Sequence, residues 1–449
     1  MFIKKYAGIM ILAALLAFTL IGCKGKVEKD GNSKNLTVLN YADMTAPNTA
    51  ATQGWTWGTF RERNEDISLM IEDLFNEPFH NKTEAYSASG NMPDVLYVWP
   101  SGRSTSLHQN KQLKDLTPLI QRDGLKRVYN PIAMDPSQQA SGYLAMIPLT
   151  ITTTHMFFVN MEVLNEVGLQ PARTYNELVA QVPVLRAAGY DTVIMPNADT
   201  WVMQSCLFSM IAGRFGGADW HEKILNGQAK FTDLEFVNAL NFIKRLYTDG
   251  VLQQSSIATS YGDGPGMFAN NRGAYYIDGD WRVGAFITDS SSGRALISPE
   301  RQRNIRLTVF PDIDGAKINK TNSGVLGTGW AMDAAIPAGS AREEAAWTLI
   351  KWLTSREIQT RGVNDGAYRA AARTDINPAD LKLEPLQVSA GAFDSEYSTI
   401  TVVIDAVFHS DVFGVINDGL QEIGLGTRTP QQVAEATQRA FDTWKASNK

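Results

Sequence analysis

The chain has 449 residues, of which 44% are hydrophobic, and this is enough apolar material for more than one hydrophobic core. Its 41 Lys and Arg residues and 47 Asp and Glu residues give a formal net charge of −6, which disfavours a nucleic-acid-binding protein that relies on attraction to phosphate. The high apolar content also excludes a disordered chain. The two cysteines and five scattered histidines form neither CxxC nor HExxH, so we expect no metal site.

The first 22 residues are typical of a secretory signal peptide. Lys4 and Lys5 precede an apolar run, residues 7–21, that is too short to span a bilayer comfortably. The run ends in the sequence LIGC, which resembles the bacterial lipobox and whose cysteine is Cys23. We therefore expect Cys23 to carry acyl chains such as palmitate and to anchor the protein to a membrane outside the cytoplasm. Ordinary cleavage beside an incidental cysteine is the alternative. Residues 23–34 are polar and predict a lipidated, flexible tether.

In chain order, the first predicted element of the mature chain is a strand over residues 36–41. A helix is expected from about residue 64, because five apolar residues share one helical face. These are Ile67, Met70, Ile71, Leu74 and Phe75. Residues 94–99 form a short apolar run typical of a buried strand, and Thr117-Pro118 predicts the start of another helix. Strands are also expected at residues 143–147 and 155–160.

Capping boxes predict three later helices, because a hydroxyl group and a carboxylate three residues apart can satisfy the free N–H groups of a first turn. The pairs are Thr174 with Glu177, Thr232 with Glu235, and Ser340 with Glu343. Gly189 and Gly250 stand where the first two helices should end, and Pro183 implies a kink or an early break. Strands are predicted at residues 274–278, 305–310 and 329–333, and Thr429-Pro430 opens a last helix. This alternation indicates an α/β protein with mostly parallel sheets.

Six of the ten tryptophans are predicted in loops or at strand ends. They are Trp55, Trp57, Trp99, Trp201, Trp281 and Trp330. Aromatic rings in loops can form flat apolar platforms with polar groups beside them, and a pyranose ring has matching apolar faces and an equator of hydroxyl groups. A structural role stays open for each ring, but we expect some of them to line a binding pocket.

Two carboxylates, Asp278 and Asp280, follow the predicted strand at residues 274–278. They could act as acid and base, accept hydrogen bonds from ligand hydroxyl groups, or cap the next helix. The glycine-rich segments match neither the P-loop nor the dinucleotide-binding fingerprint, and no GxSxG motif occurs, so we expect no cofactor.

Several motifs in order resemble the extracellular solute-binding proteins of bacterial ABC sugar importers, the group that contains maltose-binding protein. The matching pieces are MPDV at residues 92–95, LKDLTP at 113–118, FVN at 158–160 with GL at 168–169, TYNEL at 174–178, MFA at 267–269 with GAY at 273–275 through Trp281, and AW at 346–347 with LTS at 353–355. Val159 stands where the family usually has tyrosine. The resemblance covers nearly all of the mature chain.

This resemblance implies a two-lobed α/β fold, similar to periplasmic binding proteins, that closes on a sugar in a cleft between the lobes. The first lobe would comprise residues 35–152 and 303–338, and the second lobe residues 153–302 and 339–449. Trp281 would be a stacking platform, with Asp278 or Asp280 accepting hydrogen bonds from sugar hydroxyl groups.

Two further tryptophans follow from matched positions, Trp99 in the first lobe and Trp201 in the second. Trp55, Trp57 and Trp330 rest only on their predicted loop positions. The resemblance also implies that the protein is not an enzyme and that its partners are a carbohydrate and the subunits of an ABC permease. We expect a monomer that binds no nucleic acid. A secreted glycan hydrolase that uses Asp278 and Asp280, a sensor for a membrane kinase, and a receptor for a non-sugar solute remain alternatives.

Overall fold

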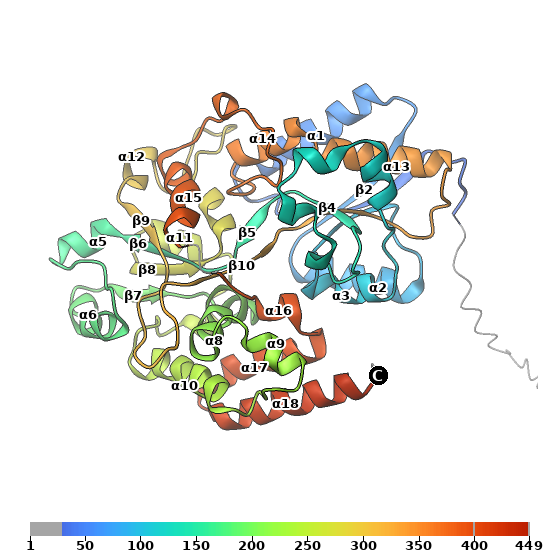
Figure 1. Ribbon diagram of the computed structural model, residues 1–449. Helices are drawn as coiled ribbons and strands as arrows, with labels where there is room; N and C mark the ends of the chain where they lie inside the picture. Colours follow the sequence, from blue (N-terminus) through green and yellow to red (C-terminus); the bar gives the residue numbers. More distant parts are fainter. Residues whose placement is uncertain (1–28, 398–399, 448–449) are drawn as a thin grey trace, which may run out of the picture.

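The computed structural model describes residues 29–397 and 400–447, so the predicted signal peptide and Cys23 lie outside the described residues. Strands of the described residues form three sheets, and Figure 1 shows two α/β halves joined near β5 (Ile151–Thr153) and β10 (Asn322–Leu326). We call the half that contains the N-terminal strand the first lobe and the other half the second lobe.

The first lobe is built on a five-stranded sheet. Its order is β2 (Ser68–Leu74), β1 (Asn35–Tyr41), β3 (Val95–Val98), β11 (Gly329–Met332) and β4 (Met146–Pro148). β1 runs parallel to β2 and β3, whereas β11 is antiparallel to β3 and β4. The helices of this lobe are α1 (Thr49–Arg63), α2 (Glu77–Ser89), α3 (Thr105–Gln109), α4 (Thr117–Arg122), α13 (Ala341–Leu353) and α14 (Arg356–Asn364).

The second lobe contains a four-stranded sheet. Its order is β7 (Asp191–Ile194), β8 (Gly273–Asp278), β6 (Met156–Asn160) and β9 (Ile305–Thr308). Its longer helices are α6 (Tyr175–Ala187), α8 (Ser209–Gly216), α10 (Leu234–Thr248), α15 (Pro385–Glu396), α17 (Ser410–Leu425) and α18 (Pro430–Ser447). Its shorter helices are α5 (Met161–Glu166), α7 (Trp201–Met203), α9 (Trp220–Leu225), α11 (Gly264–Ala269), α12 (Pro299–Gln302) and α16 (Ile404–Val407).

The third sheet joins the two lobes. It has the order β12 (Ile400–Thr401), β10 and β5. The chain enters the second lobe through β5, which follows β4, and returns to the first lobe through β10, which follows β9. It enters the second lobe again after α14. The buried apolar residues form four clusters, two in each lobe, so the lobes pack separately on either side of these connections. This arrangement is suited to hinged motion.

The predicted strands are confirmed, and so are the N-caps of two of the three predicted capping boxes. The sheets are mixed, so the prediction of mostly parallel sheets is wrong. Thr174 accepts a hydrogen bond from the Glu177 amide at the start of α6, and Ser340 accepts one from the Glu343 amide at the start of α13. Gly189 has a φ of 87°, a left-handed conformation that tolerates few other residues after a helix.

The predicted helix from residue 64 is wrong. Residues 68–74 form β2, an edge strand that pairs in parallel with β1 from Asn35 opposite Ser68 to Tyr41 opposite Leu74. The apolar spacing fits a helix as well as a strand, and pairing with β1 decides between them. Met70 is 73% exposed because it lies on the outer face of this edge.

Two helix boundaries also differ from the prediction. α10 begins at Leu234 with Asp233 at its N-cap position, so Thr232 and Glu235 form no capping box, and Glu235 pairs instead with Lys317 at 3.1 Å. α6 continues through Pro183 without a break. Pro183 is exposed, so water can satisfy the backbone carbonyl that loses its partner.

Part of the predicted tether lies against the first lobe. The ammonium group of Lys29 lies 3.0 Å from Asp94 Oδ1 and 2.8 Å from Asp333 Oδ2, and its side chain is largely buried. Arg342 donates a hydrogen bond to the Asp30 carbonyl oxygen at 3.1 Å. Residues 29–34 are therefore docked and are not a flexible tether, because two buried carboxylates bind the Lys29 ammonium group.

The sheets divide the chain differently from the predicted lobes at two places. β9, predicted in the first lobe, pairs with β6 of the second lobe. α13, predicted in the second lobe, packs with β1 and β11 of the first lobe, where Trp347 is fully buried. These two assignments are wrong because sequence order alone does not show which sheet a segment joins.

The cap of α13 gives a measurable prediction. Replacing Ser340 by alanine should lower the free energy of unfolding by about 1 kcal/mol, because the Glu343 amide loses its acceptor in the first turn. Urea denaturation monitored by circular dichroism measures this change. Ser340→Asp should retain most of the stability, and equal stability of Ser340→Ala and the wild type would contradict the role of the cap.

Candidate binding site between two aromatic clusters

The first part of the site is an aromatic cluster of the second lobe, formed by Trp201, Tyr261 and Trp281. Trp281 Nε1 donates a hydrogen bond to Tyr261 Oη at 2.5 Å. The Trp201 ring meets the Tyr261 ring edge-on at 4.8 Å and lies 6.3 Å from the Trp281 ring. Trp201 and Trp281 both remain partly exposed. Contacts with Tyr261 therefore fix the orientation of two indoles that remain partly exposed.

Local geometry at the end of β8 determines where Trp281 lies. The 3-10 helix η7 (Asp280–Ala285) follows β8 after Gly279, and the Trp281 ring folds back over this glycine. A Cβ atom at Gly279 would stand 2.3 Å from the ring, so any other residue there would displace the indole. The absence of a side chain at Gly279 therefore allows the Trp281 ring to occupy this position.

Asp278 is fully buried and its carboxylate is saturated. Its oxygens accept hydrogen bonds from Tyr276 Oη at 2.6 Å, Tyr261 Oη at 3.1 Å, the Gly279 amide at 2.8 Å and Arg282 Nε at 2.6 Å. Burial is the main cause that raises the pKa of Tyr261 and Tyr276 well above the usual range. Asp278 therefore orients Trp281 through Tyr261, a role that differs from the predicted contact with sugar hydroxyl groups.

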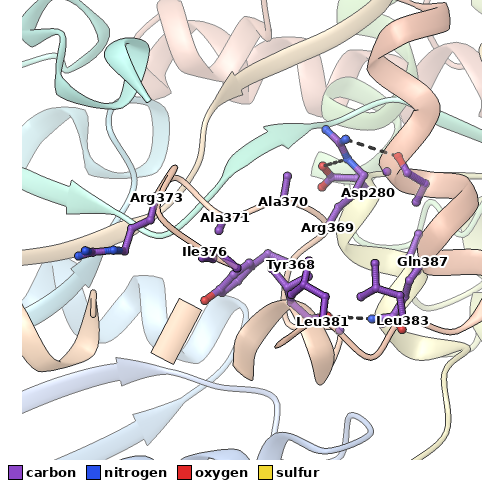
Figure 2. A pocket seen from close by; sticks show the side chains of 16 residues that line it. Asp280, Tyr368, Arg369, Ala370, Ala371, Arg373, Ile376, Leu381, Leu383 and Gln387 are labelled. Atoms are coloured by element: carbon purple, nitrogen blue, oxygen red, sulfur yellow. Dashed lines mark hydrogen bonds and ion pairs between the residues drawn. The ribbon is translucent and has the colours of Figure 1, made fainter. Parts of the chain in front are cut away.

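The Asp280 carboxylate lies against β5 and Arg369 and is not part of the aromatic cluster that contains Trp281. Its carboxylate accepts hydrogen bonds from the Thr153 amide at 2.9 Å and from Arg369 Nε at 3.0 Å, and both side chains of the ion pair are almost fully buried. Figure 2 shows this ion pair at one end of a cavity of about 270 Å³ whose other walls include Tyr368, Leu381 and Leu383. The ion pair joins η7 to β5 and to the segment after α14.

The second part of the site is an aromatic cluster of the first lobe, formed by Tyr41, His80, Tyr97 and Trp99. The Trp99 ring lies 4.9 Å from the His80 ring, 5.1 Å from the Tyr41 ring and 5.8 Å from the Tyr97 ring. Burial lowers the pKa of His80 to about 3, so its imidazole is neutral at neutral pH. Trp99 remains partly exposed.

The other three tryptophans occupy different surroundings. Trp55 and Trp57 lie on α1, so their predicted loop positions are wrong, whereas Trp330 lies near the start of β11. Trp57 on α1 is 5% exposed and Trp330 on β11 is 4% exposed, and their rings meet edge-on at 6.1 Å behind Tyr97. Trp55, also on α1, packs between the Trp352 ring and the Arg361 guanidinium group, at an open groove of about 680 Å³. Trp55 therefore lies apart from both aromatic clusters.

One hydrogen bond between the lobes joins the two clusters. Asn76, at the start of α2, donates through Nδ2 to Asp199 Oδ1 at 3.2 Å. The other oxygen of Asp199 accepts the Tyr261 amide at 2.8 Å. The ring of Phe75, the residue before Asn76, lies 5.1 Å from the Tyr41 ring. The two aromatic clusters therefore stand on either side of this hydrogen bond, which is one of several contacts between the lobes.

Sequence reasoning missed Tyr41, Tyr261 and Asp199 as members of the site. Tyr41 ends a strand and Tyr261 precedes a glycine-rich turn, and both positions are typical of binding residues in α/β proteins. Among the residues that the structure describes, no three His, Cys, Asp or Glu side chains gather to hold a metal ion. In the same described part, no helix is long and apolar enough to cross a membrane.

Two hinged α/β lobes with an aromatic cluster on each side of their contact define the class of two-lobed solute receptors. The chain belongs to the family of bacterial extracellular solute-binding proteins, whose sequence pattern matches residues 45–360. The predicted two-lobed fold and the predicted family are thereby confirmed. Members of this family bind solutes and are not enzymes, so the hydrolase alternative is set aside.

Individual relatives are distant. The chain is 20% identical to a maltotriose-binding protein of Pyrococcus abyssi over 324 residues, which are 72% of this chain and 63% of that protein. An ABC transporter extracellular-binding protein of Pyrococcus horikoshii matches at 20% identity over 44% of each chain. The chain therefore spans less than two thirds of the length of these curated relatives.

Solved structures agree over a larger share of the chain. A protein solved in a study of xylan utilisation by Caldanaerobius polysaccharolyticus superposes with a TM-score of 0.78 at 19% identity, covering 90% of this chain and 99% of that one. The maltotriose-bound MalE domain of Bdellovibrio bacteriovorus superposes with a TM-score of 0.70 at 15% identity, covering 92% and 100%. At these identities the likeness concerns the fold.

Proposed function

We propose that this protein is a receptor for a sugar or oligosaccharide, which binds between the aromatic cluster of the first lobe and that of the second lobe. The observation that carries the proposal is the Asn76–Asp199 hydrogen bond, because it lies between partly exposed indoles of both lobes. The faces of Trp281 and Trp99 suit the apolar faces of a pyranose. Relatives that bind maltotriose support this class of solute.

Binding would favour closure of the lobes only to the extent that the sugar binds the closed form more tightly than the open form. In the proposed cycle the closed receptor, a monomer, delivers its sugar to the permease subunits of an ABC importer. The naming of the P. horikoshii relative as an ABC transporter protein supports this partner. We further propose lobe boundaries that follow the sheets, with β9 in the second lobe and α13 in the first.

A direct binding experiment tests the function. Isothermal titration calorimetry with the chain from residue 24 onward should show saturable binding of at least one member of a panel of maltotriose, xylotriose, chitotriose, raffinose and galactose. A dipeptide mixture serves as the control for a non-sugar solute. Binding of the peptides with no binding of any sugar would overturn the proposed solute class. Chromatography of the sugars after incubation should show no shorter products.

The lipid anchor is a separate proposal that rests on the LIGC sequence before the polar segment. When the full chain is expressed in a bacterial host, labelled palmitate should be incorporated into the wild type, and the protein should sediment with membranes. Cys23→Ala should abolish the label and release the protein from the membrane fraction. Equal labelling of Cys23→Ala would show that another position carries the lipid.

A further inference from the structure

The short helix α16 lies where the second lobe meets the first. Its first residue, Ile404, donates its backbone N–H to Ser209 Oγ at 3.0 Å, which holds the helix on the second lobe. Its other side contacts η1 (Gly102–Ser104), which follows β3 in the first lobe. The contact is close, because a Cβ atom at Gly102 would stand 2.2 Å from the Asp405 carbonyl oxygen. Asp405 therefore lies at the boundary between the lobes.

Within the described residues, the carboxylate of Asp405 is half-buried and has no partner on another residue. Across residues 29–397 and 400–447, it makes no hydrogen bond or ion pair with any other described residue. The positive charge that lowers the pKa of Asp405 is that of Arg103 in η1, which itself forms an ion pair with Glu77 at 3.0 Å. Burial raises the pKa of Asp405 to about 6. In contrast, Asp199, which also lies between the lobes, uses both carboxylate oxygens in hydrogen bonds to protein groups.

A hydrogen-bond donor without a partner lies beside the aromatic cluster of the second lobe. Arg282 Nε binds Asp278, and its guanidinium group stacks over the Tyr261 ring at 4.2 Å, yet the buried Nη2 atom has no acceptor within the described chain. Arg282 and Asp405 both act on the pKa of the Cys206 thiol, so both side chains lie around the same part of the second lobe.

Unsatisfied buried donors and acceptors are costly, and hydrogen bonds to charged groups are about twice as strong as those between neutral groups. A sugar hydroxyl group can donate to a carboxylate and accept from a guanidinium group at once. We propose that Asp405 and Arg282 Nη2 bind the hydroxyl groups of the solute, with Asp405 as the acceptor next to the first lobe. This inference rests on the proposed sugar-binding function and adds the polar contacts that accompany the indoles.

The variant Asp405→Asn tests the inference in two measurements. Calorimetry with the sugar of the panel that the wild type binds most tightly should show an affinity reduced at least about tenfold, since a charge-assisted hydrogen bond is lost. The melting temperature of the sugar-free protein should rise, because the variant removes a half-buried carboxylate that has no partner on another described residue. The matched control is Asp123→Asn. The Asp123 carboxylate is bound by Trp347 and Lys351 within the first lobe, so this change should lower the melting temperature and leave sugar affinity unchanged.

Each outcome separates this inference from the proposed function. Binding of no sugar by the wild type would overturn both. Equal sugar affinity of Asp405→Asn and the wild type, or a lowered melting temperature of the sugar-free variant, would overturn only the role of Asp405. Arg103→Ala provides a further check. If Asp405→Asn no longer changed affinity in that background, Asp405 would act by attracting Arg103 between the lobes, and direct contact with sugar would be wrong.

The stability of the sugar-free protein should also depend on Asp405 through pH. The pKa of Asp405 is about 4 in the unfolded chain and about 6 in the folded protein, so folding favours the neutral acid. The stabilisation that results is complete below about pH 4 and is lost as the pH rises through about 6. Arg103 of η1 and the backbone N–H of Asp405 itself lower the pKa of Asp405, and no described residue of α17 acts on it. Asp405 in turn raises the pKa of the Cys206 thiol in η5 (Gln204–Phe208). The gain in melting temperature from Asp405→Asn should therefore be larger at pH 7 than at pH 5, and an equal gain would contradict the raised pKa.

Discussion

Replacing Asp278 by alanine is expected to lower the free energy of unfolding by about 3–5 kcal/mol, the typical cost of removing one partner of a buried ion pair. Arg282 would keep its charge in a buried place with no counter-ion at 2.6 Å, and the hydroxyl groups of Tyr261 and Tyr276 would lose their acceptor. Urea denaturation of the sugar-free protein, with tryptophan fluorescence as the signal, measures the change.

An exposed carboxylate is the appropriate control. Asp263 is exposed and its carboxylate accepts a hydrogen bond from Ser260, so Asp263→Ala should change stability by less than about 0.5 kcal/mol. If Asp278→Ala were as stable as the wild type and lost only sugar binding, the carboxylate would be a ligand contact, as the sequence alone suggested, and the saturated network would be the wrong explanation.

Replacing Trp281 by alanine is expected to weaken sugar affinity by at least about tenfold, which corresponds to about 1.4 kcal/mol. The indole supplies a partly exposed face whose orientation is held by its hydrogen bond to Tyr261. Loss of ring stacking removes on the order of 1 kcal/mol, and loss of apolar contact area adds to this. Calorimetry with the tightest sugar of the panel measures the affinity, and circular dichroism checks that the fold is retained.

Two matched variants sharpen this test. Trp281→Phe keeps an aromatic face but loses the N–H donor, so its affinity should fall between those of the wild type and the alanine variant. Trp55→Ala removes an indole that lies between Trp352 and Arg361, away from both clusters, and it should leave affinity unchanged. Wild-type affinity of a folded Trp281→Ala protein would remove the central residue of the proposed site.

Short-range signals in the chain predicted much of the local structure. Strands such as β1 and β8 follow from compact apolar runs, and the starts of α6 and α13 follow from Thr174 and Ser340, because a cap is satisfied within a few residues. The helix expected in place of β2 failed because an edge strand exposes one side, and its pairing partner lies about thirty positions earlier in the chain.

The candidate site was predictable in part. Trp281, Trp201 and Trp99 stand out because motif position and residue type coincide, and the structure places all three in the two clusters that meet between the lobes. The burial of Trp57 and Trp330 was not predictable, because it depends on how α1 and β11 pack. Tyr261 and Asp405 carried no motif signal.

Local patterns and ordered motifs were sufficient to predict the α/β class, the order of most elements, the family and the indoles most suited to stacking. The folded arrangement was needed to show that protein groups bind the carboxylates of Asp278 and Asp280, whereas the Asp405 carboxylate has no partner on another described residue. Hydrogen-bond saturation depends on groups brought together from distant parts of the chain, such as Arg369 against Asp280, and no local pattern encodes that distance.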